Sequence, residues 1–264
     1  MRNHFLRAAV GNAPTYVTDN LVFHIDAGNL NSYDSEDSAT TVNSLVGSIS
    51  SSSYDSNISH SSSDGGYWTF KSIEVAGNNN DTGTGIEFNS ITSFMPLGSN
   101  DITFECWMKR TGGNFNGPYS IYRTLTNGNE KAGFLKLIYQ NQMFFGKDNA
   151  TSPDTGYADY ISSSNTAVST NTWQHIVASH DTSAGELRIY VDGTWNNLYF
   201  NVDTANWSSY HNNATDSYIL RVGYGNSGYI MNGDISIVRF YKGKALSSTE
   251  VTQNYNAEKA RYGY

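Results

Sequence analysis

The chain has 264 residues, a formal net charge of −8, and 38% hydrophobic and 14% aromatic residues. No run of Lys and Arg could follow a phosphate backbone, and no apolar stretch reaches the roughly 18 residues of a membrane helix, so we expect neither nucleic-acid nor membrane binding. The single cysteine, Cys106, excludes an internal disulfide and is expected to be a buried thiol. A chain of this length is compatible with one large all-β domain.

An N-terminal arm is predicted before the domain. Residues 1–18 show no clear hydrophobic period, so we expect them to order against a neighbouring protein. Phe5, Leu6 and Arg7 are the candidate anchor residues of this arm. The folded domain is predicted over residues 19–264.

Short strands separated by turn signals are predicted along most of the domain. Runs rich in aromatic and β-branched residues give expected strands at 21–25, 67–70, 85–88, 101–109 and 173–180. A turn at 78–83 separates two of them, and residues 44–66, rich in Ser, Asp and Gly, are expected to form a long surface excursion. The stretch 134–145 is interpreted as a hairpin turning at 140–142. This spacing favours a two-sheet jelly roll.

Period-two alternation is clearest after residue 173. Leu187, Ile189 and Val191 alternate with polar or amphipathic residues, which predicts a strand with one buried face. Asp192 and Gly193 can then supply the positive φ values of a tight hairpin. The same alternation predicts two opposite faces in the next long strand, namely Ile235, Ile237 and Arg239 against Ser236, Val238 and Phe240.

A short helix is predicted near the C-terminus, at about residues 247–259. Ser247 is a good N-cap, and Glu250 follows it at the spacing of a capping box. Leu246 and Val251 flank this start and can form a hydrophobic staple.

The order of these motifs resembles the laminin-G-like, concanavalin A-like lectin/glucanase superfamily. The resemblance is carried by residues 173–193, which end in Leu-Arg-Ile-Tyr-Val-Asp-Gly, and by residues 233–251, which contain Gly-Asp-Ile-Ser-Ile-Val-Arg-Phe-Tyr and Leu-Ser-Ser-Thr-Glu-Val. Residues 101–109 resemble the early core strand of that group. The resemblance extends over about residues 17–263 and implies an all-β, concanavalin A-like two-sheet jelly-roll sandwich with a short C-terminal helix.

Both ends of this region are similar to the variant of the superfamily found in virion proteins of tailed phages. Residues 17–33 and 253–263 carry that similarity. It implies a structural protein of the virion, either a capsid decoration or a tail or fibre component, assembled in the host cytoplasm. Its partners would be other virion proteins, reached through the arm and the sandwich surface, and particle symmetry favours a homo-oligomer.

A carbohydrate-binding adhesin that recognises host surface glycan is the alternative function. Aromatic rings would stack on sugar rings at loop tips, and the candidate contacts are predicted to lie in loops or at strand ends. They are Tyr119, Tyr122, Tyr157, Tyr160, Trp195, Tyr199, Trp207 and Tyr210.

A glycoside hydrolase is the third function considered. The resemblance implies Glu-x-Asp-x-x-Glu on one strand in relatives that cleave β-glucans, with the outer carboxylates as the acid and the nucleophile. That motif does not occur in this chain, and Glu74, Glu87 and Glu105 are isolated acids on separate predicted strands. We therefore predict that the protein is not an enzyme.

No cofactor is predicted, and calcium is the one candidate metal. The resemblance implies Ca²⁺ sites built from loop carboxylates in many laminin-G-like domains, and Asp26, Asp192 and Asp234 are the candidate ligands here. Asp192 can instead shape its turn by bonding its own backbone, and Asp26 can likewise be a turn former. His175 and His180 are five residues apart and should face opposite ways in a strand, so we expect structural, hydrogen-bonded histidines.

Overall fold

The computed structural model describes the backbone at residues 15–34, 40–71, 85–89, 91, 100–112, 115–124, 130–139, 142–148, 157–163, 167–201, 217–223 and 231–264. Side chains are described at the same positions apart from those within 115–163, 197–201 and 217.

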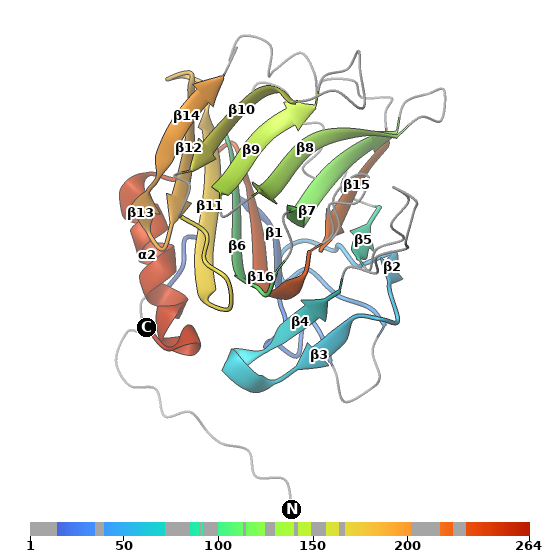
Figure 1. The fold of residues 1–264 in the computed structure, drawn as a ribbon. Helices are drawn as coiled ribbons and strands as arrows, with labels where there is room; N and C mark the ends of the chain where they lie inside the picture. Colours follow the sequence, from blue (N-terminus) through green and yellow to red (C-terminus); the bar gives the residue numbers. More distant parts are fainter. Residues whose placement is uncertain are drawn as a thin grey trace, which may run out of the picture.

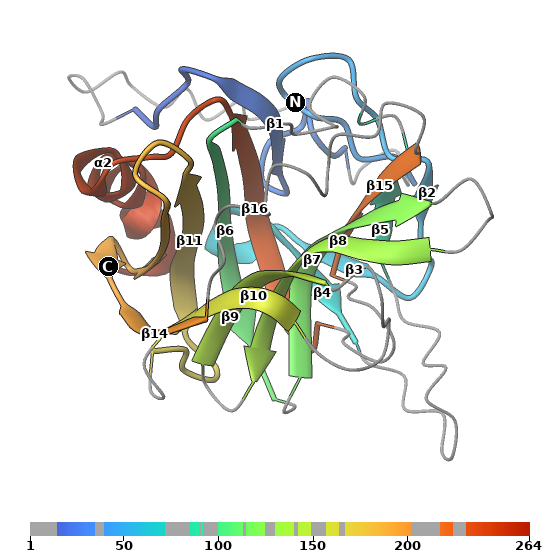
Figure 2. The same cartoon turned by 90° about the horizontal axis from the view of Figure 1, so that it is seen from above.

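Two antiparallel sheets pack face to face (Figures 1 and 2). The sheet that we call the back sheet has the order β13 (Thr194–Trp195), β12 (Glu186–Val191), β11 (Trp173–Asp181), β6 (Ile102–Arg110), β16 (Gly233–Lys242), β4 (Tyr67–Phe70) and β3 (Ser59–Ser61), with β1 (Leu21–Asp26) also paired to β16. The front sheet has the order β14 (Asn197–Asn201), β10 (Tyr157–Ser163), β9 (Gln142–Asp148), β8 (Glu130–Tyr139), β7 (Phe115–Thr124), β15 (Ser217–Val222), β5 (Ile86–Phe88) and β2 (Ser53–Tyr54). The predicted all-β jelly-roll sandwich is confirmed.

The main core fills the space between the sheets. Strand β6 shows why, because alternate residues of a strand point to opposite faces of its sheet. Four residues of β6 join the core between the sheets, each at most 1% exposed: Ile102, Phe104, Cys106 and Met108. The expected burial of the Cys106 thiol is therefore confirmed. The side chains between these four face outward, where they meet the C-terminal helix.

The alternation predicted for β16 is wrong at its first residues. The pairing register with β6 shifts between Ile235 and Ile237, so a β-bulge at Ser236 inserts one extra residue. Ile235 therefore lies in the same core cluster as Val238 and Phe240, whereas Ile237 packs on the outer face of the back sheet. A strict period of two cannot predict such an insertion, because the bulge reverses the faces on either side of it.

The polar stretch at 44–66 is more than a surface excursion. It contributes β2 to the front sheet and β3 to the back sheet, and a short 3₁₀ helix, η2 (Ser63–Gly65), follows. Ile49 and Ile58 are 5% and 6% exposed and join the core. The segments 67–70 and 85–88, which we expected on either side of one turn, lie in different sheets as β4 and β5.

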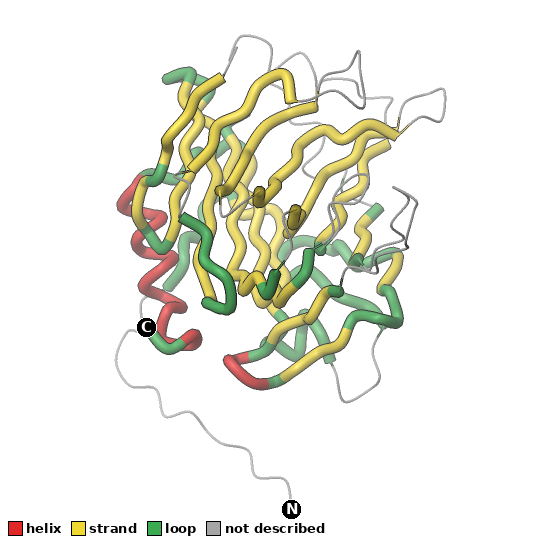
Figure 3. The backbone as a smooth tube through the Cα atoms, viewed as in Figure 1, coloured by secondary structure: helices red, strands yellow, loops and turns green. Residues whose placement is uncertain are grey.

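One α-helix, α2 (Ser248–Glu258), lies along the outer face of the back sheet and is followed by the 3₁₀ helix η4 (Lys259–Tyr262) (Figure 3). Its start confirms the capping box, since Ser247 Oγ accepts from the Glu250 backbone N–H and the Glu250 carboxylate accepts from the Ser247 N–H. Leu246 and Val251 are fully buried in one cluster, as the staple requires. No helix in the described ranges is long and apolar enough to cross a membrane.

Removing this cap should weaken the protein measurably. We expect Ser247→Ala to lower the free energy of unfolding by about 1 kcal/mol, because the backbone N–H of Glu250 loses the side-chain oxygen that accepts its hydrogen bond at the N-cap. Urea unfolding followed by circular dichroism measures this difference. Thr249→Ala, at an exposed position within the first turn of the same helix, is the matched control and should change stability much less. Equal losses in the two variants would contradict the capping role.

Candidate functional site

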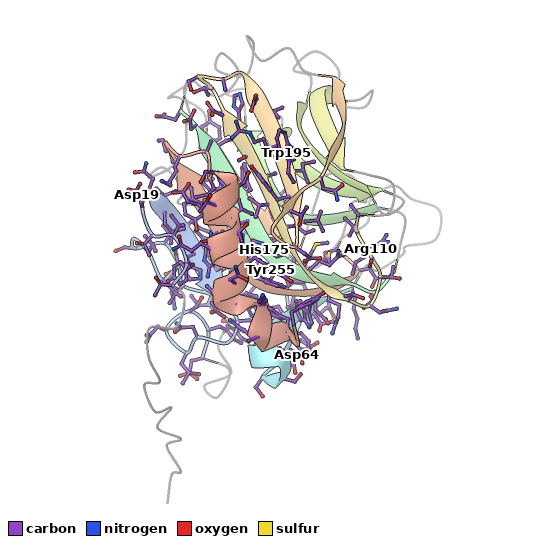
Figure 4. All side chains as sticks on the ribbon, turned by 90° about the vertical axis from the view of Figure 1, so that its left-hand side faces the viewer. Asp19, Asp64, Arg110, His175, Trp195 and Tyr255 are labelled. Atoms are coloured by element: carbon purple, nitrogen blue, oxygen red, sulfur yellow. The ribbon has the colours of Figure 1, made fainter. Side chains whose placement is uncertain are left out.

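A buried polar cluster lies between α2 and the back sheet, where Figure 4 labels His175 beside the helix. Its centre is Glu105 of β6, whose side chain is completely buried. The carboxylate accepts hydrogen bonds from Arg239 Nη1 at 2.8 Å, from Asn254 Nδ2 at 2.7 Å and from Tyr241 Oη at 3.3 Å, and it lies 3.0 Å from His175 Nε2. We call these five residues the Glu105 cluster.

Arg239 of β16 is the permanent cation of this cluster. Its side chain is also completely buried, and its guanidinium donates to the carboxylate of Glu258 at the end of α2 as well as to Glu105. The ring of Tyr16 covers the guanidinium at 4.0 Å. Arg239 thereby connects β6, β16, α2 and the segment that precedes β1.

The electrostatics of the Glu105 cluster fit a structural role. Burial alone would raise the pKa of Glu105, but the charge of Arg239 and the hydrogen bonds from His175 and Asn254 outweigh it and lower that pKa to about 2. Burial likewise disfavours the charged form of Arg239, but the carboxylates of Glu258 and Glu105 raise its pKa. Because the charges are satisfied inside the protein and closed to solvent, the cluster can stabilise the fold but cannot reach a substrate. The expected structural, hydrogen-bonded role of His175 is confirmed.

The end of the predicted N-terminal arm belongs to the folded body. Val17 is 8% exposed, its backbone N–H donates to Asn254 Oδ1 at 2.7 Å, and its carbonyl accepts from Tyr241 Oη at 3.0 Å. The carbonyl of Thr15 accepts from Gln253 Nε2 at 2.7 Å. We call residues 15–17 the arm root. Residues 15–17 of the arm predicted over residues 1–18 therefore pack on the domain, and the predicted anchors Phe5, Leu6 and Arg7 lie outside the described residues.

The three candidate calcium ligands do not come together. Within the described part of the chain, no group of three or more His, Cys, Asp or Glu side chains could hold a metal ion. Each candidate carboxylate instead accepts from the protein: Asp26 from Arg261 at 2.6 and 2.9 Å, Asp234 from Lys109 at 2.9 Å, and Asp192 from the backbone N–H of His175 at 2.9 Å. Asp192 and Gly193 have φ values of 51° and 78°, which confirms the predicted tight turn.

The acidic side chains that the structure describes are engaged with protein partners. Glu105 is buried in its cluster, and Glu87 of β5 pairs with Arg221 of β15 at 2.6 Å. Near α2, Glu250 is likewise paired, with Lys244 at 2.8 Å. Glu74 lies outside the described residues. Two carboxylates facing a common space, as the two-carboxylate mechanism of glycoside hydrolysis requires, do not occur among these described pairs.

The candidate aromatic contacts divide into three groups. The prediction of loops or strand ends is wrong for Tyr119 and Tyr122, which lie inside β7, and for Tyr160 and Tyr199, which lie inside β10 and β14. The Asn-Gly pair at 116–117 belongs to β7, where a register shift accommodates it, so it does not mark a turn. Two candidates lie at strand ends, Tyr157 and Trp195, and two lie outside the described residues, Trp207 and Tyr210.

Trp195 is the described aromatic side chain that is most open to solvent, with 53% of its surface exposed. It pairs with Tyr190 across the β12–β13 ladder, and the hydroxyl of Tyr190 lies 3.3 Å from Ser248 Oγ of α2. Because paired residues share a face of the sheet, Trp195 lies on the face that carries α2, as Figure 4 shows. Thr252 Oγ1 donates to the carbonyl of Gly193 at 3.4 Å and joins the helix to this hairpin.

A second aromatic group lies toward the other end of α2. Tyr255 stacks on the buried Trp107 with ring centroids 5.7 Å apart, and Tyr264 lies 6.2 Å from Tyr255. Tyr264 is 47% exposed. Neither Tyr255 nor Tyr264 was among the aromatic contacts predicted from the sequence. Their signal was present in the tyrosine-rich ending, but only the folded chain places them beside the hairpin that carries Trp195.

Comparison with protein families gives one match. The family described as the concanavalin A-like lectin/glucanases superfamily matches residues 80–252, which is more than half of the chain. No curated protein matches the sequence.

Solved structures with the same fold include enzymes and receptor-binding domains. The sialidase of Trypanosoma rangeli, solved in complex with sialic acid, has 12% identity and a TM-score of 0.58, and the match covers 95% of this chain and 35% of the sialidase. The receptor-binding domain of botulinum neurotoxin C/D mosaic serotype has 12% identity and a TM-score of 0.58, with 92% and 52% coverage. The receptor-binding domain of botulinum neurotoxin type G has 13% identity and a TM-score of 0.51, with 89% and 51% coverage. The chain spans a third to a half of these proteins, and identities this low show similarity of fold alone.

Proposed function

The chain belongs to the concanavalin A-like lectin/glucanase superfamily, and on that premise we propose that it is a non-catalytic structural protein of a tailed-phage particle. It would be a capsid decoration or a tail or fibre component that docks onto other virion proteins. The observation that carries the proposal is the arm root, because these residues at the end of the predicted arm are held on the domain by hydrogen bonds.

The contacts of the arm root supply the physical argument. An arm can attach the domain to another protein only if the base of the arm stays bound to the domain. Here the base is held by two hydrogen bonds to Val17, and the ring of Tyr16 lies 4.0 Å from the buried Arg239. The arm residues that precede this base can then order against a neighbouring subunit, by strand addition or by side-chain contacts.

Two further features support a non-catalytic structural role. The described carboxylates are paired within the fold rather than directed into one space. The phage setting rests on the similarity of residues 17–33 and 253–263 to virion proteins, and it implies assembly in the host cytoplasm and a closed homo-oligomer on the particle.

Removing the arm should separate folding from incorporation. We expect a chain lacking residues 1–14 to unfold within about 0.5 kcal/mol of the full chain, because the arm root stays in place. The same truncation should abolish incorporation into virions when it replaces the full protein in infected cells. Purified particles, analysed by quantitative mass spectrometry and by immunogold electron microscopy, give the measurement.

Point variants sharpen this test. Alanine at Phe5, Leu6 and Arg7 together should reproduce the loss of incorporation, whereas alanine at Arg2, Asn3 and His4 is the matched control and should not. Normal incorporation of the truncated chain would contradict docking through the arm. Absence of the full-length protein from every particle would contradict the virion assignment itself.

A carbohydrate-binding adhesin is the second candidate function. The similarity to domains named for receptor binding, and to a sialidase solved with sialic acid, supports it at the level of the fold. The solvent-open ring of Trp195 supports it at the level of residues. The two functions are compatible in one molecule, since a virion protein that docks by its arm leaves other surfaces free for a host glycan.

A further inference from the structure

We propose that the outer surface of α2, together with the β12–β13 hairpin, binds a neutral glycan by stacking a sugar ring on Trp195. We call this the α2 surface. It lies on the outer side of the back sheet, on the side of the molecule shown in Figure 4. The inference rests on the second candidate function, the adhesin, and does not depend on the arm.

The exposed face of α2 is free of charge. The solvent-exposed residues of the helix carry only hydroxyl and amide groups, and they are Ser248, Thr249, Thr252, Gln253 and Asn256. Solvent faces of helices usually carry charged residues. Hydroxyls and amides both donate and accept hydrogen bonds, which matches the hydroxyl groups of a sugar.

The charged side chains of α2 are engaged with other groups of the protein. Glu250 is held by Lys244 at 2.8 Å and by the N-cap, and Glu258 is held by Arg239. Lys259, just after the helix, lies over the ring of Tyr255 at 5.4 Å. A ligand on the helix face would therefore meet dipoles rather than net charge, which favours a neutral ligand over a sialylated or sulfated one.

Aromatic rings flank this uncharged face at both ends. Trp195 lies beside the first turns of α2, through the contacts of Tyr190 with Ser248, and Tyr264 lies with Tyr255 beside the last turns. An indole offers a flat apolar face to the C–H groups of a pyranose ring while the neighbouring polar groups bond its hydroxyls. Two aromatic positions along one helix suit a chain of several sugars better than a monosaccharide.

Other partner classes fit this surface less well. Among the described residues, large exposed hydrophobic side chains occur only at Leu30, Trp195 and Tyr264, so the ring of Trp195 is not part of a continuous apolar patch of the kind that anchors a protein or a lipid surface. A nucleic acid needs Lys or Arg against its phosphates, and the exposed residues of α2 include neither.

The test measures binding of the full-length chain to defined polysaccharides. Dextran and mannan serve as neutral probes, and heparin and polysialic acid as charged ones, in affinity electrophoresis and calorimetry. We expect a neutral probe to bind, Trp195→Ala to raise its dissociation constant by about tenfold or more, and Trp195→Phe to retain most of the affinity. Leu30→Ala, which removes another large exposed apolar side chain, is the matched control and should leave binding unchanged.

The possible outcomes distinguish a wrong binding site from a wrong adhesin function. If the wild-type chain binds neither neutral probe, the proposed glycan is overturned, and binding of charged probes alone would show an adhesin of a different chemistry. If a neutral probe binds equally well to Trp195→Ala, the adhesin function stands and the α2 surface is overturned as its site. Thermal unfolding of both variants shows whether a loss of binding reflects the site or the fold.

Discussion

Replacing Arg239 with methionine is expected to lower the free energy of unfolding by about 3–5 kcal/mol. The substitution keeps most of the buried volume but leaves the carboxylate of Glu105 without its cation in a fully buried position. It also removes the donor to Glu258, so the end of α2 loses its contact with β16. Guanidinium unfolding of the purified variant, followed by tryptophan fluorescence, measures the loss.

Two comparison variants show whether the loss comes from the unpaired charge. Arg221→Met breaks a pair with Glu87 in which the two side chains are 13% and 31% exposed, and it should cost about 1 kcal/mol or less. Combining Arg239→Met with Glu105→Leu removes both buried charges and should recover part of the stability. If Arg239→Met costs no more than Arg221→Met, the buried charges of the Glu105 cluster do not stabilise the fold.

Local signals in the sequence predicted the local structures. The helix start at Ser247 and the turn at Asp192 and Gly193 depend on residues a few positions apart, so their chemistry is complete within the segment. The individual predicted strands are found in the structure for the same reason, because each depends on its own alternation of residues and on the turn residues that flank it. The two-sheet sandwich was predicted from the spacing of these strands and turns and from the family resemblance, but neither predicted the order of the strands within the sheets.

Contacts between distant segments could not be predicted in this way. Glu105 and Arg239 meet because β6 and β16 are neighbours in register, 134 positions apart in sequence. From the sequence each was one charged residue in an apolar strand, and such a residue signals a buried partner without naming it. The bulge at Ser236 is also a tertiary feature, since Ser236 Oγ donates to the carbonyl of Gly66.

The candidate surface was predictable in part. Trp195 was expected as a contact because it was predicted to lie in a loop or at a strand end, and the structure exposes it at the end of β13. The lack of charge on the exposed face of α2 could have been seen from the helical period, once the helix bounds were known. That Tyr255 and Tyr264 lie beside the same hairpin depends on how the helix packs on the back sheet, which no local pattern encodes.

The second large effect that we expect is a loss of stability in mild acid, and His24 is one of its main causes. This side chain of β1 is 1% exposed, and neither ring nitrogen has a hydrogen-bond partner among the described residues. The ring of Tyr16 meets it edge-on at 5.1 Å. Burial and then the charge of Arg239 hold the pKa of His24 well below its usual 6.5, and the charge of Glu105 only partly opposes them.

The direction of the pH effect follows from proton binding. Near pH 6.5 the unfolded chain takes up a proton at His24 while the folded chain does not, so stability is full above that pH and falls as the pH decreases. The loss is about 1.4 kcal/mol for each pH unit until the folded pKa is reached. His180 contributes in the same direction between pH 6.5 and 4, because burial lowers its pKa to about 4. Glu105, with a pKa of about 2, adds its own loss only below about pH 4.5.

Urea unfolding at pH 7.5, 6.5, 5.5 and 5.0 separates these groups. Between pH 6.5 and 5, the slope of the unfolding free energy against pH in the wild type should correspond to the uptake of nearly two protons on unfolding. His24→Leu should reduce this number by about one, because leucine fills the site without a titrating group. His180→Leu should reduce it by a similar amount, and the double variant should be nearly flat. At pH 7.5 His24→Leu should be as stable as the wild type or more so, since the buried ring nitrogens have no partner to lose. An unchanged slope in His24→Leu would show that His24 is not the acid-sensitive group.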